Sequence, residues 1–395
     1  MTIADIAARA RETGRLGIDT EFMGEGRYRS LLCLVQVAVL DDDPSAPSIV
    51  EVIDPLDEAI DPAPLAAVLA DPAVEIIMHA GRQDVALLRR SWQTEVTNVF
   101  DTQVAAGFAG LRAQAGYESL IREVLGIKLH KSASFTRWDA RPLSDEQVSY
   151  AREDVLHLIQ LAIELQQRLA ASGRLEWARE ECRLLEGVSD VREAQSVFNK
   201  LPRVNSLDAG QRAVALELTV WREEAAREGD RPVQSVLGDA ALVELAKRRP
   251  KDKERLLQIR GLSEAAMHRR GGQILDAIAR GRQRAPIPAE GEAPPQPDPL
   301  DAALTALAEA LVRARALESR LAYELIAAKA DLGRIVVAVR DGRAEPAVRT
   351  LEGWRRELVG EELLALLRGE LSLRVGPSRE VCVEPTGVET AGASA

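Results

Sequence analysis

The sequence predicts an α/β domain built on a mixed sheet, followed by two all-helical domains. Three observations lead to this fold class. Short apolar runs rich in β-branched residues fill the chain before about residue 110, and helical periodicity dominates from about residue 116 onward. A proline-rich stretch at 285–299 then divides the helical part in two. At 395 residues the chain is long enough to form several such cores.

The strands of the first domain are expected in five places. They lie at 16–22, 31–40, 48–54, 74–80 and the beginning of 99–109. Turn-like segments separate the first three runs, and this spacing favours an antiparallel meander. Helices are expected near 62–70 and over 81–90, so strands and helices alternate after the meander. Such a pattern is typical of a layered α/β fold with a mixed sheet.

The rest of the chain is expected to be helical, apart from an irregular piece at 130–144. A long helix should begin after Ser206 as its N-cap and end at Gly229. The resulting domain boundaries are 1–200 for the α/β domain, 204–284 and 300–375 for the helical domains, 285–299 for the linker, and 376–395 for a tail predicted to be disordered.

Composition limits the class of protein. Aromatic residues make up only 4% of the chain, so alanine, leucine and valine must carry the packing. No apolar run approaches the roughly 20 residues that span a bilayer, and the N-terminal stretch lacks the apolar core of a signal peptide. The three cysteines, Cys33, Cys182 and Cys382, form neither metal-ligand pairs nor a disulfide framework. A reducing, cytoplasmic location is therefore expected.

Two acids interrupt the first strand. Asp19 and Glu21 are separated by one residue, so both point to one face of the strand, about 6.6 Å apart along the backbone at ~3.3 Å per residue. Two carboxylates this close repel each other unless a cation joins them. Taken alone, the pair favours an ordinary solvated surface pair, because such pairs are common.

Three further residues change that weighting. Asp84 follows a strand and opens a helix, where an acid can also simply interact with the helix dipole. Tyr150 and Asp154 are four residues apart, so they share one helix face, as an ordinary half-buried tyrosine could too. If all four acids meet at one site, they could hold two divalent ions, Mg²⁺ or Mn²⁺, for phosphodiester hydrolysis, with the tyrosine hydroxyl orienting water.

The segments "IDTEF", "MHAGRQDVALL" and "YAREDVLHL", in this order, resemble the three motifs of the DEDD exonuclease superfamily in its tyrosine-containing branch. Residues 16–170 resemble the ribonuclease D family in particular. The resemblance implies a ribonuclease H-like sheet and a two-metal 3′→5′ exonuclease. It also implies roles: Asp19 would bridge both metals, Glu21 and Asp154 would hold the metal that activates water, Asp84 would support the second, and Tyr150 would position the nucleophile.

Three other residues near these motifs receive weaker assignments. Asp101 in "FDTQ" also matches the family and is expected to be structural. His79 could contact the terminal ribose, although a satisfied structural histidine is the commoner outcome. Phe22 could stack on the terminal base, with a core phenylalanine as the equal alternative.

The helical part resembles the HRDC domain, a nucleic-acid-binding module, mainly through the stretch around Trp221, Asp230 and Pro232. The net charge of −11 argues against a nucleic-acid partner, but local charge matters more. From 203 to 284 there are 17 basic and 12 acidic residues, a balance of 17 − 12 = +5. The densest basic stretches are 246–255 and 267–272, and either could also be a plain solvated face.

The second helical domain resembles the C-terminal helical domain of ribonuclease D through residues 352–370, as a second HRDC-like domain that binds RNA or only packs against its neighbours. These resemblances predict a 3′→5′ exoribonuclease that releases nucleoside 5′-monophosphates and trims tRNA precursors and other structured RNAs. A DNA exonuclease with the same site, and a non-catalytic RNA-binding scaffold, are the alternatives.

Overall fold

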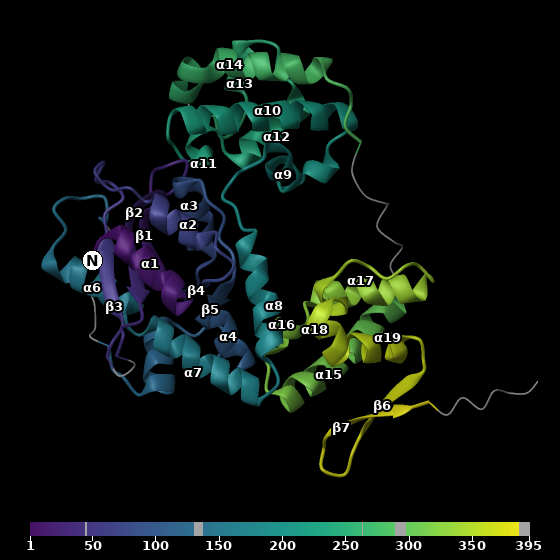
Figure 1. Ribbon diagram of the computed structural model, residues 1–395. Coiled ribbons are helices and arrows are strands. Elements are labelled where there is room, and N and C mark those ends of the chain that lie inside the picture. The colour runs from purple at the N-terminus through teal and green to yellow at the C-terminus, as the bar shows by residue number, and fades with distance from the viewer. Residues whose placement is uncertain (44–45, 130–136, 263, 289–297, 387–395) are drawn as a thin grey trace, which may run out of the picture.

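The structure is a computed structural model, and it describes residues 1–43, 46–129, 137–262, 264–288 and 298–386. Three units are visible in Figure 1: an α/β unit, a helical second unit above it, and a third unit beside it that ends in a β-hairpin. Among the helices within these ranges, none is long and apolar enough to cross a membrane. Cys33, Cys182 and Cys382 are free thiols.

The sheet of the first unit has the predicted mixed topology. Its strands are β1 (Arg15–Met23), β2 (Leu31–Val39), β3 (Ile49–Ile53), β4 (Glu75–Met78) and β5 (Val99–Asp101). The spatial order is β3-β2-β1-β4-β5. β1, β2 and β3 form the antiparallel meander, whereas β4 pairs parallel to both β1 and β5. The strand that carries Asp19 and Glu21 therefore lies at the centre of the sheet.

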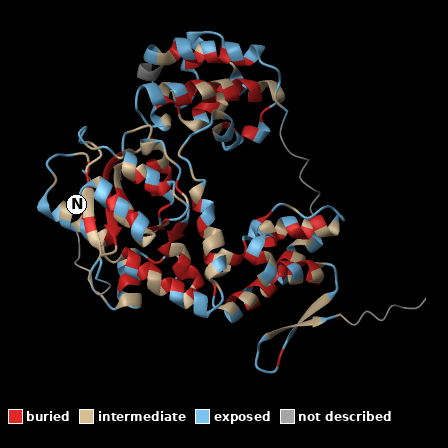
Figure 2. Ribbon diagram, viewed as in Figure 1, coloured by how far each residue is buried: buried red, intermediate tan, exposed pale blue. Residues whose placement is uncertain are grey.

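Helices cover both faces of this sheet. They are α1 (Ile3–Thr13), α2 (Ala63–Leu69), α3 (Arg82–Trp92), α4 (Thr102–Phe108), α5 (Tyr117–Leu120), the π-helical η1 (Ile121–Leu125), α6 (Asp145–Leu156), α7 (Leu158–Ala171) and α8 (Leu175–Glu186). Side chains from α1, α2 and α3 pack with Leu16 and Ile18 on one face. Side chains from α4 and α7 pack on the other, with Ile77 and Phe100. Buried residues in Figure 2 follow these two layers.

The second unit is a helical bundle with its own core. Its helices are α9 (Ala194–Asn199), the 3₁₀ turn η2 (Val204–Ser206), α10 (Ala209–Glu228), α11 (Val233–Val236), α12 (Asp239–Arg248), α13 (Lys253–Leu257) and α14 (Glu264–Gln283). Phe198 and Leu201 are buried in this core. Phe198 lies before residue 200, where the α/β domain was expected to end, and Leu201 lies before the expected start at 204, so the second unit begins earlier, near α9.

The start of the long helix α10 differs from the sequence prediction. The N-cap is Asp208, not Ser206, because the Asp208 carboxylate accepts from the Gln211 N–H while the Gln211 side chain accepts from the Asp208 N–H. This reciprocal pair satisfies two backbone donors at once, which a serine two residues earlier in a 3₁₀ turn does not do. Gly229 does follow the helix as its C-cap, as predicted.

The third unit packs directly on the first. Its elements are α15 (Pro299–Ser319), α16 (Tyr323–Ile326), α17 (Lys329–Arg340), η3 (Arg349–Leu351), α18 (Gly353–Arg355), η4 (Arg356–Gly360), α19 (Glu361–Leu367), β6 (Leu371–Val375) and β7 (Val381–Pro385). The Trp354 ring meets Phe108 edge-on at 4.9 Å and stacks on Trp177 at 5.4 Å, measured between ring centroids. Of the two roles expected for this unit, packing is therefore confirmed.

The tail differs from the prediction of disorder. β6 and β7 pair antiparallel, so residues up to 385 form a hairpin, while 387–395 lie outside the described residues. Leu371, Leu373 and Val383 rest against the core shared by the first and third units. Apolar contact of one hairpin face accounts for the ordered pairing. Of the irregular piece expected at 130–144, residues 130–136 also lie outside the description, and 137–144 contain only turns and bends.

Candidate active site

The central strand presents Asp19 and Glu21 toward α6 and α7. Gly17, two residues before Asp19, shows how closely that layer approaches, because a Cβ placed there would lie 3.3 Å from the Ile159 side chain on α7. Ile18 and Thr20 point the other way, toward α1, α2 and α3. The strand period of two therefore places both acids on one face of the strand, as the sequence predicts.

Asp84 enters the site from the first turn of α3. Its side chain is buried, and its carboxylate accepts a hydrogen bond from the Thr20 hydroxyl on β1. The turn before α3 is held by Asp101, which accepts from the N–H groups of Gly81 at 2.8 Å and Ala80 at 3.2 Å. Asp101 also caps α4 through the Gln103 and Val104 N–H groups. The structural role expected for Asp101 is thus visible: it positions the helix that carries Asp84.

Tyr150 and Asp154 both lie on α6, on one helix face. A capping box between Ser144 and Gln147 fixes where this helix begins. The Tyr150 hydroxyl bonds to the Asp154 carboxylate, and the Tyr150 ring lies 6.0 Å from the Trp138 ring, between centroids. The hydroxyl is thereby held beside one acid of the group.

The four acids disturb one another's ionisation. Burial, followed by the charges of Asp84, Asp154 and Glu21, raises the pKa of Asp19 well above its usual value. Burial and the charges of Asp154 and Asp84 raise the pKa of Glu21 to about 8. Burial is the main cause for the others, raising the pKa of Asp154 to about 7 and that of Asp84 to about 6. Four acids that are buried or half-buried and repel one another indicate a site built for positive charge.

Within the described part of the chain, no lysine or arginine forms an ion pair with Asp19, Glu21, Asp84 or Asp154. Among the same residues, no three acids, histidines or cysteines lie close enough together to hold a metal ion as they stand. Carboxylates that repel one another stay apart when no cation lies between them. Hard cations such as Mg²⁺ are usually held by a few carboxylates together with water and substrate phosphate. The four acids offer only oxygen ligands and have no cationic partner among the described residues, so they fit a divalent cation.

The structure shows the surroundings of His79 and Phe22, two residues that received weaker assignments from the sequence. The His79 Nδ1 lies 3.0 Å from the Thr102 hydroxyl, which itself donates to the Met78 carbonyl, so Nδ1 must be the donor. Burial lowers the pKa of His79 and keeps the ring neutral. Phe22 is half-buried against the α1–α3 side of the sheet, away from the acid face. Contact of either residue with substrate stays a prediction.

Tyr117 is a site residue that the sequence reasoning missed. Its ring lies 5.5 Å from that of His79, and its hydroxyl is buried. Burial first, and then the charge of Asp154 with a smaller contribution from Asp19, raises the pKa of this hydroxyl. It therefore belongs to the surroundings of the acids. No local signal could have shown this, because a tyrosine at the start of a helix is read as a core aromatic.

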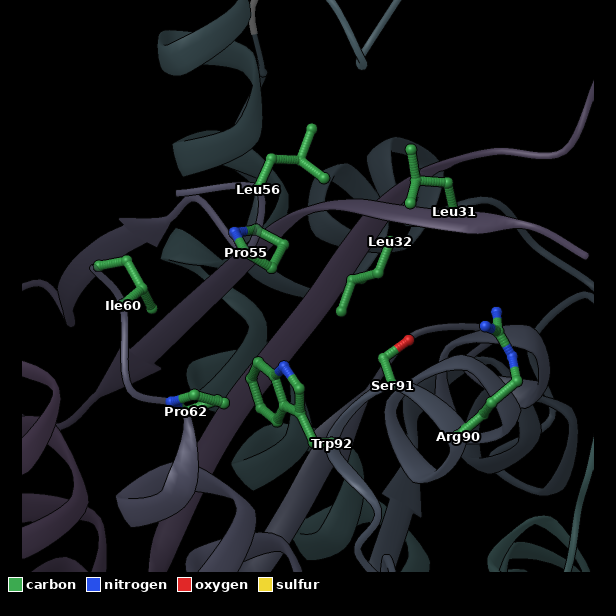
Figure 3. A pocket seen from close by; sticks show the side chains of 9 residues that line it. All are labelled: Leu31, Leu32, Pro55, Leu56, Ile60, Pro62, Arg90, Ser91 and Trp92. Atoms are coloured by element: carbon green, nitrogen blue, oxygen red, sulfur yellow. The ribbon is translucent and has the colours of Figure 1, made fainter. Parts of the chain in front are cut away.

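An apolar pocket of about 250 Å³ lies elsewhere on the first unit, and Figure 3 shows Trp92, Leu32, Pro55 and Pro62 around it. Arg90 lies at its edge, where it pairs with Asp190 and donates to the Ser30 carbonyl. None of the four acids or Tyr150 lines this pocket. It has the wrong chemistry for a phosphodiester, so the acid cluster is the candidate site.

Comparison with known proteins agrees with this geometry. A family model for 3′-5′ exonucleases matches residues 1–170, and a model for HRDC domains matches residues 211–278. The chain is 35% identical to a ribonuclease D of Gluconacetobacter diazotrophicus, covering 95% of this chain and 93% of that protein. It is 36% identical to a ribonuclease D of Granulibacter bethesdensis, with 94% and 92% covered.

A solved structure extends the similarity to the whole architecture. Escherichia coli RNase D, described as an exoribonuclease involved in structured RNA processing, superposes with a TM-score of 0.79 at 27% identity. The match covers 93% of this chain and 96% of that one. The three units described above thus recur together in a related molecule.

Proposed function

Because this chain belongs to the ribonuclease D family, a group of metal-dependent 3′→5′ exoribonucleases of RNA processing, we propose that Asp19, Glu21, Asp84 and Asp154 hold its metal and that Tyr150 acts beside them. The observation that carries the proposal is a set of four mutually repelling carboxylates, one buried and three half-buried, that have no cationic partner among the described residues. The family and the site together disfavour the non-catalytic scaffold considered from the sequence.

We take the metal to be two Mg²⁺ ions, with Mn²⁺ as the substitute. When bound, the ions would lower the pKa of an attacking water and stabilise the charge on the phosphate. The charges of Asp84, Asp154 and Glu21 all act on Asp19, which supports a role in which Asp19 would help to hold both ions. Asp84 is held by Thr20, so its free oxygen is oriented before any ion arrives.

The Tyr150 hydroxyl is the proposed partner of the attacking water. It already bonds to Asp154, and burial raises its pKa, so it stays protonated and can donate near neutral pH. Attack on the last phosphodiester would break the P–O3′ bond and release a nucleoside 5′-monophosphate. His79 and Phe22 are the proposed contacts to the terminal nucleotide.

The substrates we propose are 3′ ends of tRNA precursors and other structured RNAs, in the cytoplasm. Support for structured RNA comes from the Escherichia coli relative, which is described as acting in structured RNA processing. The HRDC match adds a nucleic-acid-binding module next to the nuclease unit.

The test uses the full-length chain with 5′-labelled RNA and DNA of one sequence, each carrying a single-stranded 3′ tail. With Mg²⁺ or Mn²⁺ the RNA should shorten stepwise from the 3′ end, and EDTA should stop the reaction. Equal shortening of the DNA would favour the DNA exonuclease alternative instead.

Asp19→Asn and Tyr150→Phe test the site. The first should abolish shortening, while the second should slow it and leave metal binding, measured by calorimetry, unchanged. A matched control is Asp145→Asn, which alters an acid in the first turn of the same helix as Tyr150. Full activity of Asp19→Asn would overturn the site assignment.

A further inference from the structure

The arginines of the second unit fall into two groups that the sequence does not separate. In the densest basic run, 246–255, the arginines have acidic partners: Arg248 with Glu244, Arg249 with Asp208, and Arg255 with Asp252. Such exposed pairs add little stability, but each places a carboxylate beside a guanidinium. The run therefore offers a phosphate less positive potential than its composition indicates.

The second group is an arginine cluster made of Arg231, Arg269 and Arg270. None of the three pairs with an acid among the residues that the structure describes. Arg231 and Arg269 are exposed, whereas Arg270 is half-buried, with Nη1 3.4 Å from the Val236 carbonyl oxygen. The contact between Arg270 and the Val236 carbonyl brings the first half of α14 against α11, which begins two residues after Arg231. Consistent with this, burial together with the charges of Arg231 and Arg269 lowers the pKa of Arg270.

Arg231 connects this cluster to the contact between the second unit and the nuclease unit. The residue before Arg231 is Asp230, whose carboxylate accepts from Arg27 at 3.0 Å and from the Tyr28 N–H at 3.1 Å. Arg27 and Tyr28 belong to the loop that joins β1 to β2. Arg231 thus lies next to a loop that begins at the strand of Asp19 and Glu21, whereas Arg269 and Arg270 lie on α14, on the side of the second unit that faces away from the nuclease unit in Figure 1.

A second contact fixes the same arrangement. Glu223 on α10 is buried and accepts from the Tyr28 hydroxyl at 3.0 Å and from Arg192 at 3.0 Å. A cavity of about 330 Å³ adjoins this contact, and Tyr28, Arg29 and Gln83 are among the residues that line it. Gln83 precedes Asp84 on α3, so open space runs from the interface to the helix of the active site. Figure 1 shows α11, which follows Arg231, on the side of the second unit that faces the nuclease unit.

We propose that Arg231, Arg269 and Arg270 bind the phosphates of the single-stranded RNA that lies upstream of the bond to be cut. This inference rests on the proposed function, because it takes RNA as the strand that enters the acid site. Unpaired guanidinium groups match phosphate geometry with two parallel donors. We assign no phosphate contact to the arginines of the run 246–255, although that run is denser in charge.

The experiment compares two triple variants of the full-length protein that each remove three positive charges. Arg231→Gln, Arg269→Gln and Arg270→Gln form the cluster variant, and Arg248→Gln, Arg249→Gln and Arg255→Gln form the control. Binding of 5′-fluorescein single-stranded RNA is measured by anisotropy in EDTA, where no hydrolysis occurs, over a series of NaCl concentrations. Each lost contact should reduce the slope of log K against log[salt] by about 0.7, so the cluster variant should lose about 2.

The control variant should keep the wild-type slope. Equal loss in both variants, or an unchanged slope in the cluster variant, would overturn the inference. Arg270 is half-buried, so a double variant of the exposed Arg231 and Arg269 is measured too, with an expected loss of about 1.4. Shortening of RNA by the wild-type protein with metal is measured separately. If the wild-type protein shortens RNA but the cluster variant binds RNA normally, only this inference fails. If the wild-type protein does not shorten RNA, the proposed function fails.

Discussion

The hydroxyl of Thr20 donates a hydrogen bond to the carboxylate of Asp84, which joins the central strand to helix α3 inside the acid cluster. The bond also lowers the pKa of Asp84, opposing the larger effect of burial. Thr20 therefore keeps one acid oriented and more easily ionised than its surroundings alone would allow.

Replacing Thr20 by valine should weaken metal binding without removing any acid. Partners behind metal ligands typically contribute about 10–100-fold in affinity or activity. We therefore expect the Mg²⁺ concentration for half-maximal RNA shortening to rise by about that factor in Thr20→Val. The matched control is Thr219→Val, a buried threonine of the second unit that bonds only to the Ala215 carbonyl. An unchanged metal requirement in Thr20→Val would contradict this role.

The metal-free protein should lose stability as the pH rises from about 5 to about 8. The pKa of Glu21 is about 8, that of Asp154 about 7 and that of Asp84 about 6, all above the value of about 4 in an unfolded chain. In this window the folded state binds more protons than the unfolded state, so the free energy of unfolding falls with rising pH. Melting temperatures in EDTA across this range measure the effect.

Divalent metal should reverse this trend, because protons compete with it for the same oxygens. The rise in melting temperature on adding Mg²⁺ should thus be larger at pH 8 than at pH 6. A metal effect that is equal at both pH values would show that these carboxylates do not bind the ion.

Asp19→Asn should make the metal-free protein more stable while abolishing its activity. Removing one of four like charges that are partly withdrawn from solvent relieves repulsion on the order of 1–2 kcal/mol, which corresponds to about 2–8 °C for a unit of this size. Because the pKa of Asp19 is raised, its carboxyl gains charge only as the pH rises, so the gain in stability should grow from low to high pH. Differential scanning fluorimetry in EDTA measures it, and a lower melting temperature at pH 8 would argue against the cluster.

Glu181→Ala should destabilise the contact between the first and third units. The Glu181 carboxylate on α8 accepts from Arg355 and from the Trp354 indole N–H, and both charged side chains are nearly buried. Leaving Arg355 buried without its partner should cost about 3–5 kcal/mol. The exposed pair of Arg374 and Glu384 gives the control, since solvent screens its attraction and Glu384→Ala should change the free energy of unfolding little. Urea unfolding of both variants makes the comparison.

Local patterns were enough to predict the strands and their mixed sheet, and to draw attention to the acids. The first strand shows its period of two in the alternation of Ile18 and Thr20 with Asp19 and Glu21, and the neighbouring apolar runs follow the same rule. The order of the strands, which places these acids at the centre of the sheet, was not predicted from the sequence. The roles of the individual acids came from family resemblance, because spacing alone favoured a surface pair.

Contacts between distant segments could not be predicted in this way. Tyr117 reaches the acids only because the fold brings its hydroxyl near Asp154 and the His157 backbone, and no local period shows that. The hairpin of β6 and β7 had a weak signal in the alternation of Leu371 and Leu373, but the Gly-Pro turn after it indicated disorder instead. Asp208, the acidic partner of Arg249, lies some 40 positions earlier in the sequence, so a count of local charges could not show that the two charges offset each other.

Trp354 of the third unit packs against Phe108 and Trp177 of the first unit, so segments far apart in the sequence complete one shared core. A chain that stopped at the proline-rich linker would keep all four acids, yet it would leave the faces of α4 and α8 that receive Trp354 bare. The second unit, tied to the β1–β2 loop and residue 192 by polar groups of Glu223 and Asp230, is the more separable part, although it lies in the middle of the sequence. During synthesis on the ribosome, the core of the first unit is therefore complete only after the last helices have been made.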